Sequence, residues 1–211
     1  MTRKDRAALA IAALKELYPD AVCSLQAADP LQLLIATRLS AQCTDARVNL
    51  VTPALFARFP TLDSLADATP EEVGEYIRSC GLYKTKARDI VAMCRILREV
   101  YGGKMPDTIE ELTKLPGVGR KTANLVCGDV FGKPAVVADT HCIRITGRLG
   151  LTDGSRDPLK VETQLRRVLP PEESNAFCHR LVLFGRDVCT ARAPKCAQCP
   201  LADTCPSVSR A

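Results

Sequence analysis

Apolar residues recur along most of this chain at spacings of three and four positions, which is the period of an amphipathic α-helix. One set near the N-terminus is Ile11, Leu14, Leu17 and Tyr18, and a later set is Ile90, Cys94, Leu97 and Tyr101. The only strand-like run covers residues 134–138, which is too short and isolated to make a sheet. The pattern therefore predicts an all-α protein.

Helix start signals divide this pattern into several short helices. Asp29 stands before Pro30, which is the order of an N-cap and a first helical residue. Thr69 and Glu72 have the spacing of a capping box, and residues 108–111 repeat that spacing. We expect a helix to begin at each of these points.

Composition indicates a globular protein with a polyanionic partner. The 211 residues are 46% hydrophobic and 25% charged, and the net charge is 29 − 24 = +5, which suits nucleic acid. Aromatic residues make up only 4%, which argues against a base-stacking platform for single strands. No apolar run approaches the roughly 20 residues of a membrane span, and no secretory signal is recognisable. We expect a cytoplasmic protein without a membrane partner.

The stretch "LPGVGRKTAN" (Leu115–Asn124) lies between two predicted helices and has the form of a helix-hairpin-helix turn. Gly117 and Gly119 permit left-handed backbone angles and leave their amides unhindered. Amides at the start of a helix can hold a phosphate, and Lys114 and Arg120 add positive charge. The stretch predicts contact with a DNA backbone, with an ordinary turn between helices as the alternative.

Lys121 differs from its basic neighbours because it falls in the first turn of the helix after the hairpin. A cation at that position opposes the helix dipole and is a poor structural choice. Because a neutral lysine amine is a nucleophile, Lys121 is a candidate catalytic residue. One more phosphate-binding lysine is the alternative that this pattern leaves open.

Asp139 opens the segment "DTHCIRITGRLGL", whose apolar spacing predicts a helix with Asp139 or Thr140 as its N-cap. The same carboxylate could stabilise the positive charge that develops on a sugar when an N-glycosidic bond breaks. Capping alone is the simpler interpretation, and one residue can do both. His141 is expected to support the site by hydrogen bonding rather than to bind a metal.

Eleven cysteines in a reducing compartment favour metal or cluster ligation over disulfides. Seven are scattered in apolar segments and are expected in the core: Cys23, Cys43, Cys80, Cys94, Cys127, Cys142 and Cys178. The other four are separated by six, two and five residues: Cys189, Cys196, Cys199 and Cys205. Four thiolates this close can enclose Zn²⁺ or an iron-sulfur cluster, and the single close pair favours a cluster. Arg192 and Lys195 lie in the first gap, where we expect phosphate contacts or solvated charge.

Together these elements resemble the endonuclease III family of DNA repair glycosylases and lyases. The matching stretches, in the family's order, are "LSAQCTD" (Leu39–Asp45), "GLYKTKA" (Gly81–Ala87), "LPGVGRKTAN", "ADTHCIRI" (Ala138–Ile145) and the run of four cysteines. The resemblance covers nearly the whole chain. It implies a two-lobed helix-hairpin-helix glycosylase fold, with a six-helix barrel lobe at residues 22–132. Residues 1–21 and 133–211 would form the second lobe and hold a [4Fe-4S] cluster on the four cysteines.

The same resemblance implies base-excision repair of duplex DNA that carries oxidised pyrimidines or abasic sites, by a monomer associated with the nucleoid. Lys121 resembles the nucleophile that forms a Schiff base with C1′ of the damaged nucleotide, and Asp139 resembles the assisting carboxylate. Gln42 and Leu82 match the positions that wedge into the duplex, although core packing is an alternative for Leu82. Two other functions are alternatives: a mismatch adenine glycosylase, which lacks the lysine nucleophile, and a non-catalytic DNA-binding module with a structural metal.

Overall fold

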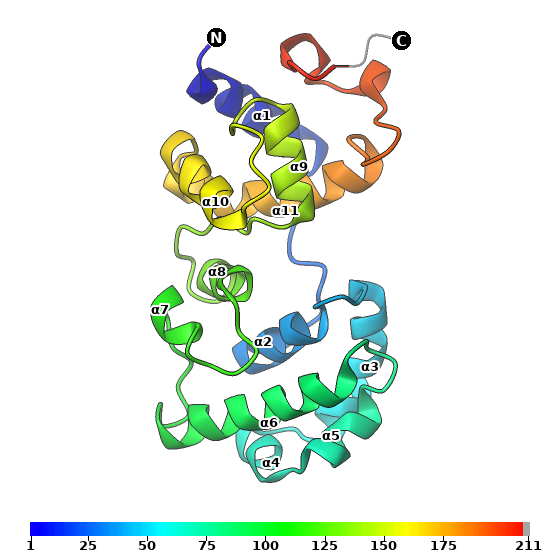
Figure 1. Cartoon of the computed structure of the whole chain (residues 1–211), viewed down its shortest axis with the longest axis vertical. Helices are drawn as coiled ribbons and strands as arrows, with labels where there is room; N and C mark the ends of the chain where they lie inside the picture. The colour runs from blue at the N-terminus through cyan, green and yellow to red at the C-terminus, as the bar shows by residue number, and fades with distance from the viewer. Residues whose placement is uncertain (209–211) are drawn as a thin grey trace. The chain divides into compact units, whose positions relative to one another are not determined.

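The computed structural model describes residues 1–208, which form α-helices and three short 3₁₀ helices with no β-strand among them (Figure 1). The predicted all-α class is confirmed, and residues 134–138 form no strand. The chain divides into two compact units, one of Cys23–Phe131 and one of Met1–Val22 with Gly132–Ala211. None of the described helices has both the length and the apolar character needed to cross a membrane.

The unit formed by Cys23–Phe131 contains six helices of six or more residues and one single-turn helix. They are α2 (Pro30–Leu39), α3 (Asp45–Arg58), α4 (Leu62–Asp67), α5 (Pro70–Tyr76), α6 (Tyr83–Glu99), the single turn α7 (Ile109–Leu112) and α8 (Arg120–Asp129). α6 is the longest, and α4 and α5 pack against it, while α2 contacts α3, α6 and α8 (Figure 1). Apolar residues of α2 and α6 are fully buried in this unit, Leu34 and Ile90 among them.

The predicted helix starts are confirmed, with one difference in detail. The Asp29 side chain caps α2 with Pro30 at its first turn, and Thr69 and Glu72 form a reciprocal capping box at α5. Thr108 caps α7 by accepting from the backbone of Glu111 at 3.2 Å. The Glu111 carboxylate does not return to Thr108, because it binds a tyrosine hydroxyl and a lysine ammonium instead.

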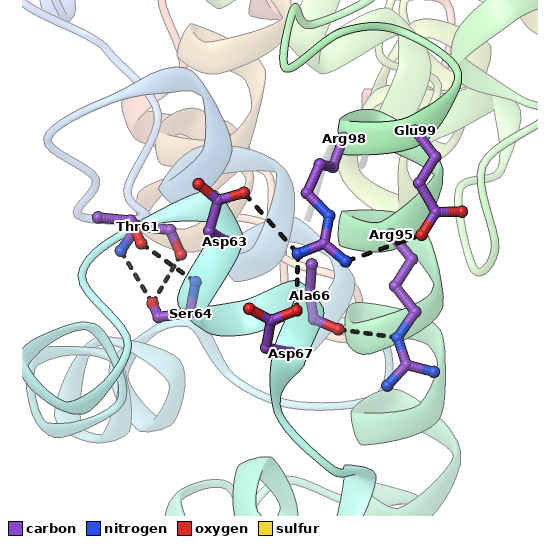
Figure 2. Close-up of polar contacts among 8 residues, drawn as sticks. All are labelled: Thr61, Asp63, Ser64, Ala66, Asp67, Arg95, Arg98 and Glu99. Carbon is purple, nitrogen blue, oxygen red and sulfur yellow. Dashed lines mark hydrogen bonds and ion pairs between the residues drawn. The ribbon is translucent and has the colours of Figure 1, made fainter.

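Two arginines fasten α6 to α4, as Figure 2 shows. Arg95 Nε donates to the Ala66 carbonyl at 2.8 Å, which satisfies an acceptor in the last turn of α4. Arg98 Nη1 donates to Asp67 Oδ1 at 2.7 Å and lies 3.8 Å from Asp63 Oδ1. These contacts fix the path of α6, whose N-terminal end carries one of the two predicted wedge positions.

The other unit contains four α-helices and the three 3₁₀ helices. They are α1 (Arg3–Leu17), α9 (Thr140–Arg148), α10 (Pro158–Val168), α11 (Ser174–Asp187), η1 (Pro171–Glu173), η2 (Cys196–Gln198) and η3 (Ala202–Thr204). α11 packs against α1 and α9 and buries Phe177 and Phe184 completely. α1 buries Ile11 and Leu14 as its pattern predicts, but Leu17 is its final residue and is exposed.

Most of the scattered cysteines lie in the two cores. Five of the seven are buried: Cys80, Cys94, Cys127, Cys142 and Cys178. Cys23 and Cys43 are only half-buried. Free cysteine behaves as a small apolar residue, so the expectation of core packing is correct for the buried five and incomplete for the other two.

Candidate functional site

The hairpin stretch folds into a tight turn that is anchored in the core on both sides. The Val118 amide donates to the Leu115 carbonyl at 3.1 Å. Pro116 and Gly117 occupy the two central positions, and Gly117 has a φ of 74°, as a type II turn requires. Leu115 and Val118 are buried. The turn is therefore held by apolar contacts at its ends, while Gly117 is exposed between them.

Gly117 lies against an ion pair that connects α2 to α6. Arg38 Nε and Nη2 donate to Asp89 Oδ2 at 2.8 and 2.5 Å. A Cβ atom at Gly117 would lie 2.7 Å from both Asp89 Oδ2 and Arg38 Cδ, closer than real Cβ contacts. Arg38 and Asp89 were not predicted from the sequence, because nothing in their spacing links them to the hairpin.

Gly119 has a different role from Gly117. It is the N-cap residue of α8 with an extended backbone (φ −91°), and no side chain caps the helix there. A Cβ atom at Gly119 would meet nothing within 4 Å. The left-handed conformation that glycine permits is thus used only at Gly117. Because the first amides of a helix have no intrahelical acceptor, the start of α8 offers donors to an anion.

The basic side chains around the turn are not equivalent. Lys114 Nζ donates to Glu111 Oε1 at 2.5 Å, and the Tyr101 hydroxyl donates to Glu111 Oε2 at 2.8 Å. Lys114, and then Tyr101, lower the pKa of the Glu111 carboxyl through these hydrogen bonds. Arg120 and Lys121 are both exposed at the start of α8. Lys114 therefore belongs to the ion pair that closes α7, whereas Lys121 is presented to solvent.

Asp139 is the N-cap of α9, as predicted. Its Oδ1 accepts from the Cys142 amide at 2.7 Å, which leaves Oδ2 outside the cap. The residue is half-buried. Two buried thiols connect this part of α9 to α11, since the side chains of Cys142 and Cys178 are hydrogen-bonded to each other. The carboxylate is therefore held at the start of α9 through one of its two oxygens.

Gly185 lets α9 approach α11 closely. A Cβ atom there would lie 2.8 Å from Arg144 Nη2. The same Arg144 nitrogen donates to the Gly185 carbonyl at 3.2 Å and lies 3.2 Å from His141 Nδ1. His141 thus takes part in the contact between α9 and α11, as expected of a supporting residue.

The four clustered cysteines line one cavity, together with apolar side chains that include Leu149, Phe184 and Val188. Burial, and then the negative charge of the other three cysteines, raises the pKa of the Cys199 thiol, and the same kinds of cause raise that of Cys205. Four thiolates sharing one cavity need a cationic centre, so the donor set fits an iron-sulfur cluster. Within residues 1–208, no three His, Cys, Asp or Glu side chains are arranged to hold a single ion.

Arg148, at the last position of α9, fastens the cysteine loop to that helix. Its Nη1 donates to the Thr190 carbonyl at 2.7 Å and its Nη2 to the Ala191 carbonyl at 2.8 Å. The Cys205 Sγ atom lies 3.5 Å from the Arg148 carbonyl oxygen. This arginine was not predicted as a site residue, although Arg144 and Arg148 share one helical face. One helix thus joins Asp139 at its start to the cysteine loop at its end.

Comparison with known proteins identifies the class to which this fold and site belong. Residues 35–171 match the HhH-GPD superfamily of base excision DNA repair proteins, and residues 189–205 match the iron-sulfur binding domain of endonuclease III. Endonuclease III of Synechocystis is 47% identical over 98% of this chain and 94% of its own length. The Escherichia coli K12 protein of that name is 40% identical over 91% of this chain and 90% of its own length.

A solved structure of a trapped covalent intermediate between endonuclease III and DNA, an estranged-adenine complex, is also similar. Its TM-score is 0.92 at 43% identity, and the match covers 98% of this chain and 97% of that one. The chain belongs to the endonuclease III family. It is a bifunctional DNA glycosylase and AP lyase of base-excision repair that carries a [4Fe-4S] cluster. The mismatch adenine glycosylase and the non-catalytic module are not favoured.

We predict that the two hairpin glycines respond differently to the same substitution. Gly117→Ala should destabilise the protein by about 2–4 kcal/mol, because the methyl group meets the Arg38–Asp89 pair and the backbone is left-handed. Gly119→Ala should cost less than about 1 kcal/mol, since its surroundings are open. Thermal unfolding followed by circular dichroism measures both. Equal stability of the two variants would contradict the close approach described for Gly117.

We also predict that the cluster depends on each cysteine of the loop. Cys199→Ser should remove the visible absorbance expected at about 400 nm for an iron-sulfur site, because a serine hydroxyl does not replace a thiolate ligand. Cys23→Ser is the matched control, since Cys23 is also half-buried but lies outside the loop. It should retain the absorbance and the iron content. An unchanged spectrum in Cys199→Ser would exclude that residue as a ligand.

Proposed function

We propose that this protein removes oxidised pyrimidines from duplex DNA through a Schiff base on Lys121 and then cleaves the strand 3′ to the abasic site. The observation that carries the proposal is the position of Lys121, exposed in the first turn of α8 directly after a turn that is anchored on both sides. An amine in a fixed place can attack without a further ordering cost.

The reaction balances without an added co-reactant. Lys121 Nζ forms a bond to C1′ as the bond from C1′ to the damaged base breaks, and the base leaves with a proton. Opening of the sugar ring gives a Schiff base between Nζ and C1′. Loss of a proton from C2′ then expels the 3′ phosphate by β-elimination, and water releases the lysine. The lysine is thus nucleophile and electron sink in turn.

Asp139 supplies the negative charge that the developing positive charge on the sugar requires. Its Oδ1 is held by the Cys142 amide, so Oδ2 is the oxygen that acts. A preorganised carboxylate stabilises such a charge without reorganisation during the reaction. This role explains why an N-cap residue, which any of several polar residues could provide, is an aspartate.

Backbone contacts place the enzyme on DNA without specifying sequence. The backbone amides of Gly117 and Gly119 and the exposed Arg120 side chain are proposed to bind phosphates beside the lesion. Arg192 and Lys195, exposed in the cysteine loop, are proposed to bind further phosphates. The cluster then has a structural role in shaping a basic loop.

Gln42 and Leu82 are proposed to fill the gap that the extruded nucleotide leaves. Leu82 is 61% exposed, which is unusual for a large apolar side chain. Both residues have left-handed backbones, with φ of 54° and 58°, and such strain clusters at functional sites. Because unstacking a nucleotide costs a few kcal/mol, side chains that fill the gap offset part of that cost. We propose that the enzyme acts as a monomer in the cytoplasm, with the nucleoid.

Covalent trapping tests the nucleophile directly. Duplex DNA with one thymine glycol is incubated with the protein and sodium borohydride, which reduces a Schiff base to a stable amine. We expect a shifted protein-DNA band with the wild type and none with Lys121→Gln, whose amide cannot form the intermediate. Strand cleavage should fall by at least about a hundredfold.

The matched control is Lys114→Gln, which removes a nearby lysine that is paired with Glu111. It should still give the trapped band. If neither the wild type nor the control is trapped while both still bind the duplex, the binding-only interpretation would replace the proposal. A band that persists in Lys121→Gln would assign the nucleophile to another residue.

The carboxylate can be tested separately from its capping role. Asp139→Asn keeps the cap, because asparagine caps helices about as well as aspartate, but it removes the charge. Base release should slow by roughly a hundredfold with little change in thermal stability. Asp157→Asn, at the N-cap of α10 in the same unit, is the control and should keep full activity. Loss of stability with unchanged base release would reduce Asp139 to a structural cap.

A further inference from the structure

Lys86 is a charged side chain inside a core. It lies in the first turn of α6 and has no solvent exposure. Its Nζ donates to the Leu39 carbonyl at 2.8 Å, and burial lowers the pKa of its ammonium group. The other groups that act on this charge are the Cys43 and Cys80 thiols and the Arg38 guanidinium, a second cation.

The favourable position at a helix C-terminus does not by itself offset the cost of burying an ammonium group. Lysine is almost never fully buried unless it is paired, and here its hydrogen-bond acceptor is a neutral carbonyl. An apolar side chain of similar volume would avoid the cost of removing the charge from water. The hydrogen bond therefore has a role beyond stabilising the core, and the two segments that it connects indicate that role.

Lys86 connects the backbone segments that carry the two proposed gap-filling residues. Its side chain bonds the carbonyl of Leu39, three residues before Gln42, at the C-terminal end of α2, where a cation is favourable. Its backbone amide donates to the Leu82 carbonyl at 3.1 Å. One residue thus holds the segment before Gln42 with its side chain and Leu82 with its backbone.

The backbone segments at Gln42 and Leu82, referred to as the two tips, also lie close together. Gln42 and Leu82 are the only residues other than glycine with a positive φ among residues 1–208. A Cβ atom on Gly81 would lie 3.5 Å from the Gln42 carbonyl oxygen, so the backbones of the two tips lie close together. The thiols of Cys43 and Cys80, one beside each tip, are hydrogen-bonded. The segments that support the two tips therefore form one region of the core, and Lys86 lies within it.

We infer that Lys86 is a positioning residue for nucleotide extrusion: its buried hydrogen bond to Leu39 keeps the Gln42 and Leu82 tips at the spacing needed to occupy the gap in the duplex. The inference rests on the proposed gap-filling role of those two residues. It adds that the strained tips need an internal support that an apolar residue could not give, since only a donor can bind the Leu39 carbonyl.

Lys86→Met tests this because methionine has a similar length but no donor. The cluster-loaded variant is assayed on thymine glycol opposite adenine in a full duplex, and on the same lesion in an unpaired bubble, where no gap must be filled. We expect the ratio of kcat/KM on paired to unpaired substrate to fall about tenfold, the scale of one lost hydrogen bond to a charged group. A general structural defect would lower both values equally and leave the ratio unchanged, which would overturn the inference.

Two further variants keep this inference separate from the proposed function. Leu97→Ala removes a buried side chain from the same helix and should lower stability without changing the ratio. Leu82→Ala tests gap filling itself and should lower the ratio. If Leu82→Ala does not change the ratio, the gap-filling proposal fails; if it does and Lys86→Met does not, only the positioning role fails.

Lys86→Gln covers the case in which the methionine variant does not fold. Its shorter amide retains a donor, so a folded Lys86→Gln should show a smaller loss in the ratio than Lys86→Met. Folding is followed by helical circular dichroism and by the visible absorbance of the cluster. If both variants fail to fold, Lys86 is a structural residue and the inference is wrong.

Discussion

The close approach of Gly117 to the Arg38–Asp89 ion pair is the constraint on which the proposed catalytic hairpin depends. The pair joins α2 to α6, and the turn lies on it with no room for a Cβ atom. Because Leu115 and Val118 are buried on either side, the turn has one stable position. The start of α8 is fixed in consequence. A reactive group in the first turn of that helix is therefore positioned by the packing of the core.

In the other unit, contacts with neighbouring segments likewise fix the position of α9. Its first turn is capped by Asp139, and its last residue, Arg148, binds two carbonyls of the cysteine loop. A cluster that organises this loop therefore also restrains the helix that carries the carboxylate. Through this connection the cluster has a structural role, which does not require electron transfer.

Strain and buried charge are concentrated where the protein is proposed to enter DNA. Two left-handed residues and one buried ammonium group occur together at the adjoining ends of α2 and α6. Each lowers stability in isolation. They persist because the surrounding core is large enough to hold them, and their common location distinguishes this region from the apolar packing around α4 and α5.

Features that depend on near neighbours along the chain were predictable from the sequence. Helical periodicity, the Asp29 and Asp139 caps, the hairpin turn and the spacing of the four cysteines are all set within a few residues, so local patterns were enough to predict them. Helix packing brings together distant residues that no local pattern connects: the Arg38–Asp89 pair beneath Gly117, the contacts of Arg148 with the cysteine loop and the surroundings of the buried Lys86. Burial and contact arise when separate helices pack together, and the spacing of residues along one chain does not encode that directly.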